Sequence, residues 1–148
     1  MRAILTALLL AIATQAGAEC GNLCDSVWWK TATEADVLAE LDGGADVTAH
    51  NEYGVTPLHL AARYCTPATI QALLAAGADV MARDEDGRTP LHIAALGRFP
   101  KVIQVLLDAG ADAKTKNKNG KTPWDLAQEN DKLKGTKGYW ALNDAQYN

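Results

Sequence analysis

Two histidines are the residues of this 148-residue chain best suited to acid–base chemistry. An imidazole titrates near neutral pH and is the side chain most often used as a general base. His59 and His92 each stand three residues after a threonine, within two copies of one heptapeptide. A third, altered copy carries Asp125 at this place, which a catalytic ring of identical histidines would not tolerate. We therefore predict a structural role for both histidines, and a solvated contact role for His50, which lies outside the heptapeptide.

The other patterns that carry chemistry are missing or incomplete. Ser26 is the only serine and lies outside any G-x-S-x-G elbow, which argues against a serine hydrolase. Zinc-protease, paired-cysteine, dinucleotide and P-loop motifs do not occur in the sequence. The acidic residues 84–86 resemble a calcium loop only loosely, because the further spaced carboxylates and the final glutamate of such a loop are missing. The sequence therefore predicts a protein that is not an enzyme and carries no cofactor or metal.

Three cysteines are too few for a disulfide scaffold, but two of them lie close together. Cys20 and Cys24 are four residues apart, and such a pair can close a small loop in an oxidising compartment. Cys65 lies eight residues past the proline that aligns with Cys24, a rise of ~12 Å along a helix. Stacked helices lie ~8–10 Å apart, so a Cys24–Cys65 pair exceeds the ~7 Å limit between bridged Cα atoms. We predict a Cys20–Cys24 disulfide, with Cys65 either buried or an intermolecular thiol.

Composition and charge restrict the partners. Hydrophobic residues make up 48% and charged residues 22% of the chain, as in ordinary globular proteins, which excludes a disordered polyelectrolyte. The formal net charge is −4, whereas a general nucleic-acid binder needs an excess of lysine and arginine. Residues 18–50 form an acidic end with one lysine against seven acidic residues, and lysines gather near residues 114–121. We expect no nucleic-acid partner, and a charge polarity that could orient a protein partner.

The N-terminal segment has the layout of a secretory signal peptide. A short positive start precedes an apolar stretch, residues 3–13, and small residues follow at the two positions that a signal peptidase reads. The stretch is shorter than the ~20 residues that span a bilayer. We predict that residues 1–18 are cleaved after Ala18, that the mature chain is periplasmic or secreted, and that no membrane attachment remains. The alternatives are a buried N-terminal helix and a lipid anchor on Cys20, which Glu19 disfavours because a lipobox needs a small residue there.

The rest of the chain repeats every 33 residues, a period typical of stacked helical units. The block Thr-Pro-Leu-His, followed by a hydrophobic residue and two alanines, begins at Thr56 and Thr89, and an altered copy begins at Thr122. A Gly-Ala-Asp block and a glycine two residues before each threonine keep the same spacing. The period divides residues 19–148 into an N-terminal cap at about 18–50, two internal units at 51–83 and 84–116, and a C-terminal cap at 117–148.

Each unit predicts two helices and a finger. Thr56 is suited to cap a helix that begins at the following proline, because its hydroxyl accepts a backbone N–H and proline loses nothing at the first helical position. A second helix starts at Pro67 and carries an apolar stripe at helical spacing, which a glycine then ends. We expect Leu74 in this stripe, and Leu107 one period later, to be buried between helix layers.

These blocks resemble the signature of the ankyrin repeat, T-P-L-H-x-A-A followed by L-L-x-x-G-A-D. The two internal units match it almost completely, and the resemblance covers residues 19–148. It implies an all-α repeat fold: an ankyrin solenoid of about four stacked helix-turn-helix units with hairpin-like fingers. It also implies that the signature histidine bonds to its threonine and to the neighbouring finger. Because one unit cannot bury its apolar face alone, stacking supplies the core.

The first and last units depart from the signature as capping units should. Glu40 occupies the place of a core leucine, and Trp28 and Trp29 replace the alanine pair. We interpret the tryptophans as a seal on the open end of the stack, with an aromatic binding patch as the alternative. In the last unit, Tyr139 and Trp140 align with the leucine pair of the preceding unit.

The resemblance implies a non-enzymatic module that binds another protein through finger tips and the concave face of the first helices. Tyr53, Tyr64 and the arginines are the expected hot spots, because rigid aromatic and arginine side chains dominate binding energy. We expect Tyr53 and Arg88 to lie outside the layers that hold the helices together. The predicted contacts are His50, Glu52, Tyr53, Val55, Arg83, Glu85, Asp86, Arg88, Lys116, Lys118, Asn119 and Lys121 on the fingers, and Arg63, Tyr64, Leu96 and Gln128 after the alanine pairs.

The identity of the partner does not follow from these residues, and nothing indicates an oligomer. One alternative function is an immunity- or chaperone-like protector of a secreted enzyme, which the sequence does not separate from general protein binding. A second alternative is an enzyme or small-molecule binder built onto the stack, which would need a pocket with converging titratable groups.

Overall fold

Two layers of helices form a stack over residues 21–148, the part of the chain that this computed structural model describes. The inner helices are α2 (Pro57–Tyr64), α4 (Pro90–Leu96) and α6 (Pro123–Gln128). The outer helices are α1 (Glu34–Asp42), α3 (Pro67–Ala75), α5 (Pro100–Asp108) and α7 (Lys137–Tyr147). In the first unit two 3₁₀ helices, η1 (Gly21–Cys24) and η2 (Trp28–Lys30), take the inner position.

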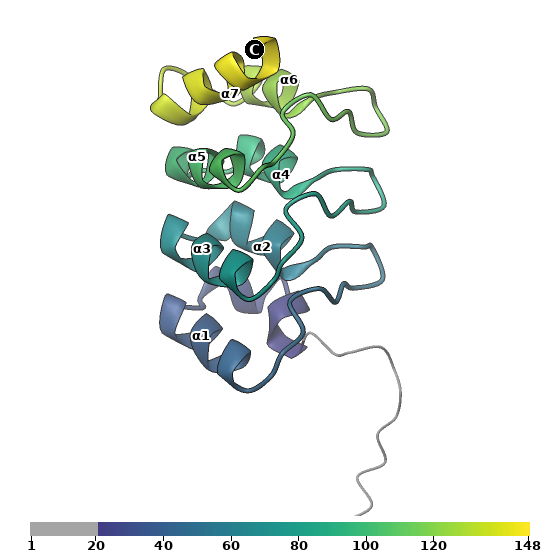
Figure 1. The fold of residues 1–148 in the computed structure, drawn as a ribbon, viewed down its shortest axis with the longest axis vertical. Coiled ribbons are helices and arrows are strands. Elements are labelled where there is room, and N and C mark those ends of the chain that lie inside the picture. The colour runs from purple at the N-terminus through teal and green to yellow at the C-terminus, as the bar shows by residue number, and fades with distance from the viewer. Residues whose placement is uncertain (1–20) are drawn as a thin grey trace, which may run out of the picture.

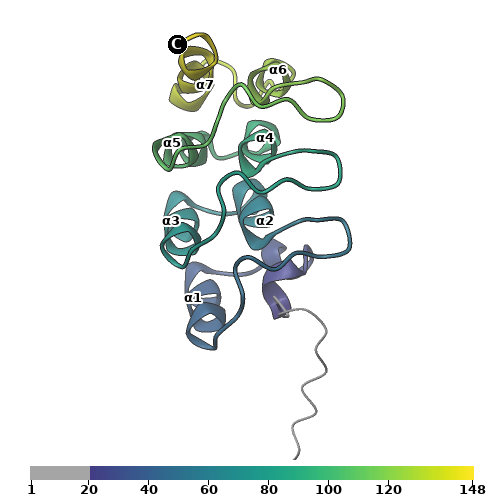
Figure 2. The ribbon, with the colours of Figure 1, turned by 45° about the vertical axis from the view of Figure 1, so that its right-hand side comes forward.

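The connections between units project to one side as fingers (Figures 1 and 2). Fingers 1, 2 and 3 comprise residues 43–56, 76–89 and 109–122. The prediction of an all-α repeat stack with fingers is therefore confirmed. None of the helices within residues 21–148 combines the length and the apolar character needed to cross a bilayer. The predicted signal peptide lies outside the described residues.

Threonine–proline pairs start the inner helices, as predicted. Thr56 accepts the N–H of the third helical residue at the start of α2, and Thr122 does the same at the start of α6. The proline that follows each threonine is the first helical residue, where no N–H is required. Gly77 and Gly110 follow the ends of α3 and α5 with φ of 98° and 93°, a region that a side chain disfavours. Local chemistry thus sets where each helix begins and ends.

The core lies between the layers and between successive units. Leu73 of α3 and Leu106 of α5 are both 0% exposed and contribute the same apolar position one period apart. The expectation for Leu74 and Leu107 is wrong, because both are only partly buried. Each lies one residue, about 100° around the helix, from the fully buried leucine. The centre of the buried stripe is therefore the first leucine of each pair and not the second.

Trp29 closes the first end of the stack. Its side chain is 1% exposed, and its indole N–H donates to the carbonyl of Leu23 at 2.8 Å. Trp28 is partly buried and meets it edge-on, with ring centroids 5.2 Å apart. The buried indole replaces the contacts that a preceding unit would supply, which agrees with the predicted seal.

The last unit leaves the 33-residue register. The start of α5 predicts an outer helix at Leu133, but α7 begins at Lys137, and Leu133 is buried in the turn before it. The sequence predicted that Tyr139 and Trp140 take the places of the leucine pair, and this prediction is wrong. Leu142 is the fully buried apolar side chain of α7, whereas Trp140 is 55% exposed. Four additional residues in the turn account for this shift.

Candidate protein-binding surface

Each finger is built on the side chain of one asparagine or aspartate. Asn51, Asp84 and Asn117 occupy equivalent positions, and each Oδ1 accepts the backbone N–H groups two and four residues further on, at 2.9–3.1 Å. These residue types favour turns because they bond to their own backbone. The glycine three residues further on has φ of 71–73°. Because the backbone of each finger is already fixed, less conformational entropy is lost when a partner binds.

Successive fingers are bonded to one another. The N–H of Glu85 in finger 2 donates to the carbonyl of Tyr53 in finger 1 at 2.9 Å, and an equivalent bond of 2.9 Å joins fingers 3 and 2. The guanidinium of Arg83 in finger 2 donates to the carbonyl of Lys116 in finger 3 at 2.6 Å. The three fingers therefore form one continuous surface.

His59 and His92 join an inner helix to the finger that follows it. The N–H of Thr56 donates to Nδ1 of His59 at 3.2 Å, so Nδ1 is unprotonated and Nε2–H donates to the Arg88 carbonyl at 2.9 Å. His92 repeats both bonds at 3.1 Å, the second to the Lys121 carbonyl. Burial lowers the pKa of both imidazoles. The predicted structural role is confirmed, since both nitrogens of each ring are engaged.

Most of the predicted finger contacts are exposed. Tyr53 is the large apolar side chain among them and is 53% exposed. His50, Arg83 and Glu85 together line a cavity of about 540 Å³ between fingers 1 and 2. The exposed set comprises His50, Glu52, Tyr53, Arg83, Glu85, Asp86, Lys116, Lys118 and Asn119. Val55, Arg88 and Lys121 are partly buried.

Arg88 also supports the fold, contrary to the expectation from the sequence. Its Nε lies 2.8 Å from the carboxylate of Asp84, whose side chain is 1% exposed. Its Nη2 lies 3.0 Å from Asp86. Removal of Arg88 would leave a buried carboxylate without its cation, which destabilises a protein. Arg88 is therefore not a clean probe of partner binding.

The structure brings finger contacts and inner-helix contacts together. Arg63 and Tyr64 at the end of α2 share a cavity of about 200 Å³ with Val55 and Arg88. The guanidinium of Arg63 lies 5.7 Å from the centre of the Tyr64 ring, a cation–π distance. Both residues also line a cavity of about 370 Å³ with Leu96, which is 42% exposed.

The cysteine predictions have different outcomes. Cys65 is a free thiol, 7% exposed, and its burial raises the pKa to about 11. A protonated, buried thiol is a poor nucleophile, so the buried alternative holds rather than an intermolecular thiol. Cys20 lies outside the described residues, and the Cys20–Cys24 pairing stays a prediction. Residues 21–148 hold no group of three or more histidines, cysteines or carboxylates arranged for a metal ion.

Sequence reasoning missed a group of residues at the helix ends remote from the fingers. Lys30, Arg98 and Phe99 line the 370 Å³ cavity together with Arg63. Lys30 stands one period before Arg63, and this spacing could have revealed it. Arg98 and Phe99 follow no repeat pattern. Gln128, which was predicted, is exposed on α6 and lines none of these cavities.

Fold and surface together define a helical-repeat scaffold that presents side chains on a row of joined fingers. The family model for ankyrin repeats (3 copies) matches residues 28–117 and, in a second alignment, residues 58–137. The match covers more than half of the chain, so the protein belongs to the ankyrin-repeat family. Ankyrin repeats are generally protein–protein interaction modules and typically non-enzymatic scaffolds. A search among curated proteins finds no match.

Proposed function

We propose that this protein is an exported binding module that holds a partner protein on its finger side. The observation that carries the proposal is the continuous finger surface, in which backbone bonds join the fingers while Tyr53 and charged side chains of both signs stay exposed. Protein interfaces combine such aromatic anchors with a polar rim.

The adjoining ends of the inner helices extend this surface. Arg63 and Tyr64, at the end of α2, share a cavity with Val55 and Arg88 of the fingers, and Leu96 offers an exposed apolar side chain one unit further along. A partner that lies along the fingers would meet this second set of side chains without any change in the stack. The partner class that fits is a folded protein of mixed charge.

Site-specific crosslinking tests the finger side. Benzoylphenylalanine in place of Tyr53 should crosslink a partner in cells, whereas the same residue in place of Tyr147 should not. Tyr147 is the matched control because it is also an exposed tyrosine, 72% exposed, but belongs to the outer helix α7 and not to a finger. Crosslinks from position 147 with none from position 53 would move the surface to the outer helices.

Affinity for the partner identified in this way gives a second measurement. Tyr53→Ala should weaken binding by about 30-fold, the loss that truncation of a hot spot produces. Tyr147→Ala should change it less than about twofold, and both variants should melt like the parent because the side chains are exposed. Equal effects of the two substitutions would count against a finger-side interface.

Export is the second part of the proposal and rests on the N-terminal segment alone. N-terminal sequencing of the protein from the periplasm or the medium should find Glu19 as the first residue. A chain that begins at residue 1, or a lipidated Cys20, would overturn the localisation. Mass spectrometry without reduction should find the peptide that contains Cys20 and Cys24 lighter by two hydrogens than after reduction.

A further inference from the structure

A groove runs along the edge of the stack that faces away from the fingers. Each inner helix starts at a finger and each outer helix leads into the next one, so the loops that join α2 to α3 and α4 to α5 lie at the opposite end. Two cavities meet there at Phe99, one of about 370 Å³ and one of about 650 Å³. We refer to these two cavities together as the base groove.

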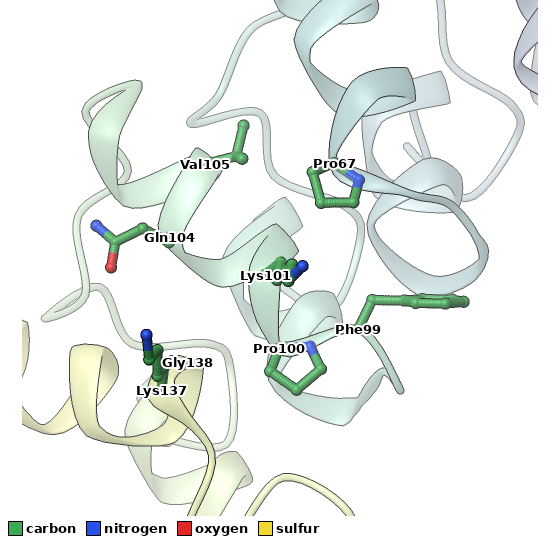
Figure 3. A pocket seen from close by; sticks show the side chains of 8 residues that line it. All are labelled: Pro67, Phe99, Pro100, Lys101, Gln104, Val105, Lys137 and Gly138. Carbon is green, nitrogen blue, oxygen red and sulfur yellow. The ribbon is translucent and has the colours of Figure 1, made fainter.

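The larger cavity is apolar. Pro67 of α3, Phe99, and Pro100 and Val105 of α5 supply its apolar lining, and the start of α7 forms a further wall at Gly138 (Figure 3). A Cβ at position 138 would overlap the Pro100 carbonyl. The glycine therefore allows α7 to pack closely on α5. The volume of the cavity lies within the range of about 300–1,000 Å³ that is usual for ligand pockets.

Cations surround the groove and no carboxylate lines it. Its lining includes Lys30, Arg63, Arg98, Lys101 and Lys137. None of these five side chains forms an ion pair with another residue in the described part of the chain, whereas Arg88 and Lys121 on the fingers are each paired with a carboxylate. Five unpaired cations beside an apolar cavity are complementary to an anionic, partly apolar ligand.

We propose that the base groove is a second docking site, which takes an acidic peptide segment of a partner with one large apolar side chain. The carboxylates would pair with Arg63 and Arg98, and the apolar side chain would pass Phe99 into the larger cavity. A nucleic acid fits less well, because the cavity floor is apolar and the chain as a whole carries a net charge of −4. The inference rests partly on the proposed function, since Arg63, Tyr64 and Leu96 border both surfaces.

A synthetic peptide tests the site without the natural partner. The probe is a short peptide of aspartate and glutamate with one central phenylalanine, titrated into the ¹⁵N-labelled protein at low salt. The amides of Gly97, Arg98, Lys101 and Gly138 should shift together, and replacement of the phenylalanine by serine should weaken binding. No shift at these amides, or shifts confined to the fingers, would overturn the proposal.

Charge reversal provides the matched pair of variants. Arg98→Glu should weaken binding of the peptide by about tenfold, the value of one charge-assisted hydrogen bond. Lys114→Glu makes the same change in net charge at another exposed position outside the groove and should change it less than about twofold. Equal losses would show a net-charge effect only and would overturn the site. A thermal melt of both variants confirms that each is folded.

Competing occupants are separated in the same assay. If an RNA oligonucleotide binds in preference to the peptide and shifts the same amides, the occupant of the groove is a nucleic acid and the peptide proposal is overturned. Concentration-dependent dimerisation abolished by Arg98→Glu would point instead to the acidic first unit of a second copy. Loss of finger-side crosslinking would leave the peptide result unchanged, so the two proposals fail separately.

Discussion

His92 in the third unit and Asp125 in the last unit form the same hydrogen bond at the start of their helices, but only His92 also bonds to the next finger. Each accepts the N–H of the threonine that precedes its helix, at 3.1 Å to Nδ1 of the histidine and 2.8 Å to Oδ2 of the aspartate. The imidazole alone extends further, to the Lys121 carbonyl in the next finger. Within the described residues no finger follows α6, so a carboxylate suffices there. The signature histidine therefore couples one unit to the next.

The same two units differ in how they hold the fingers in front of them. Arg88 of finger 2 pairs with the buried Asp84, whereas the equivalent Lys121 of finger 3 pairs with Glu129 on the surface. Finger 3 has the neutral Asn117 in place of Asp84, and the turn bonds are the same. A neutral amide thus replaces a carboxylate that would need a cation. Finger 2 therefore holds its ion pair within the finger, whereas the lysine of finger 3 pairs with a residue at the end of α6.

The largest effect should come from the core of the third unit. Leu106→Ala should reduce the free energy of unfolding by about 2–5 kcal/mol, because removal of a 0% exposed leucine side chain from α5 leaves a cavity in the core. Leu107→Ala should cost less than half as much, because Leu107 is only partly buried. Urea unfolding followed by circular dichroism measures both. A larger loss for Leu107→Ala would contradict the burial of the first leucine.

The next effect separates coupling from capping. His92→Ala removes the partners of the Thr89 N–H and the Lys121 carbonyl and should cost about 2–4 kcal/mol, the sum for two unsatisfied groups. Asp125→Ala removes a local partner only and should cost about 1 kcal/mol. Hydrogen exchange gives a second readout, because Asp125→Ala should increase exchange only at the Thr122 N–H, whereas His92→Ala should increase it in the earlier part of finger 3. Equal losses from both substitutions would remove the distinction between the two residues.

The sequence predicts the features that have a local cause. Thr56 caps because it stands before a proline and three residues before His59, and the glycines that follow the outer helices mark where those helices end. The exposure of Tyr53 follows from its place in a finger. The ion pair between Arg88 and Asp84 could also have been predicted from the sequence, because the two residues lie four apart in one turn.

The features that the sequence does not predict depend on how helices sit against one another. The choice between Leu106 and Leu107 depends on the rotation of α5 against its neighbours. The shift of α7 to Lys137 has no marker, because none of the repeating blocks occurs after residue 127. The base groove combines residues of η2, α2, α3, α4, α5 and α7 with the loop 97–99, so no single motif predicts it.

The third effect compares the two cations. Arg88→Ala leaves the Asp84 carboxylate with backbone donors alone and should cost about 1–2 kcal/mol. Lys121→Ala breaks a surface pair, in which the lysine side chain is 43% exposed, and should cost less than about 1 kcal/mol. Arg88→Ala combined with Asp84→Asn should recover most of the loss, because finger 3 already uses an asparagine. No recovery in the double variant would contradict this comparison.

The smallest effect should come from pH. Burial lowers the pKa of His59 and His92 from the ordinary 6.5, so the unfolded chain takes up protons first as the pH falls. Stability from the two neutral rings is therefore complete above about pH 6.5 and decreases as the pH falls from there toward the lowered values. The effect is small because protonation removes the acceptor at Nδ1 and leaves the ring and the Nε2–H bond in place. The urea midpoint should decrease between about pH 7.5 and about pH 5.5. The double variant His59→Asn, His92→Asn should flatten this pH dependence of the midpoint. The control His50→Asn, at an exposed histidine, should keep it. An unchanged slope in the double variant would assign the pH dependence to other groups.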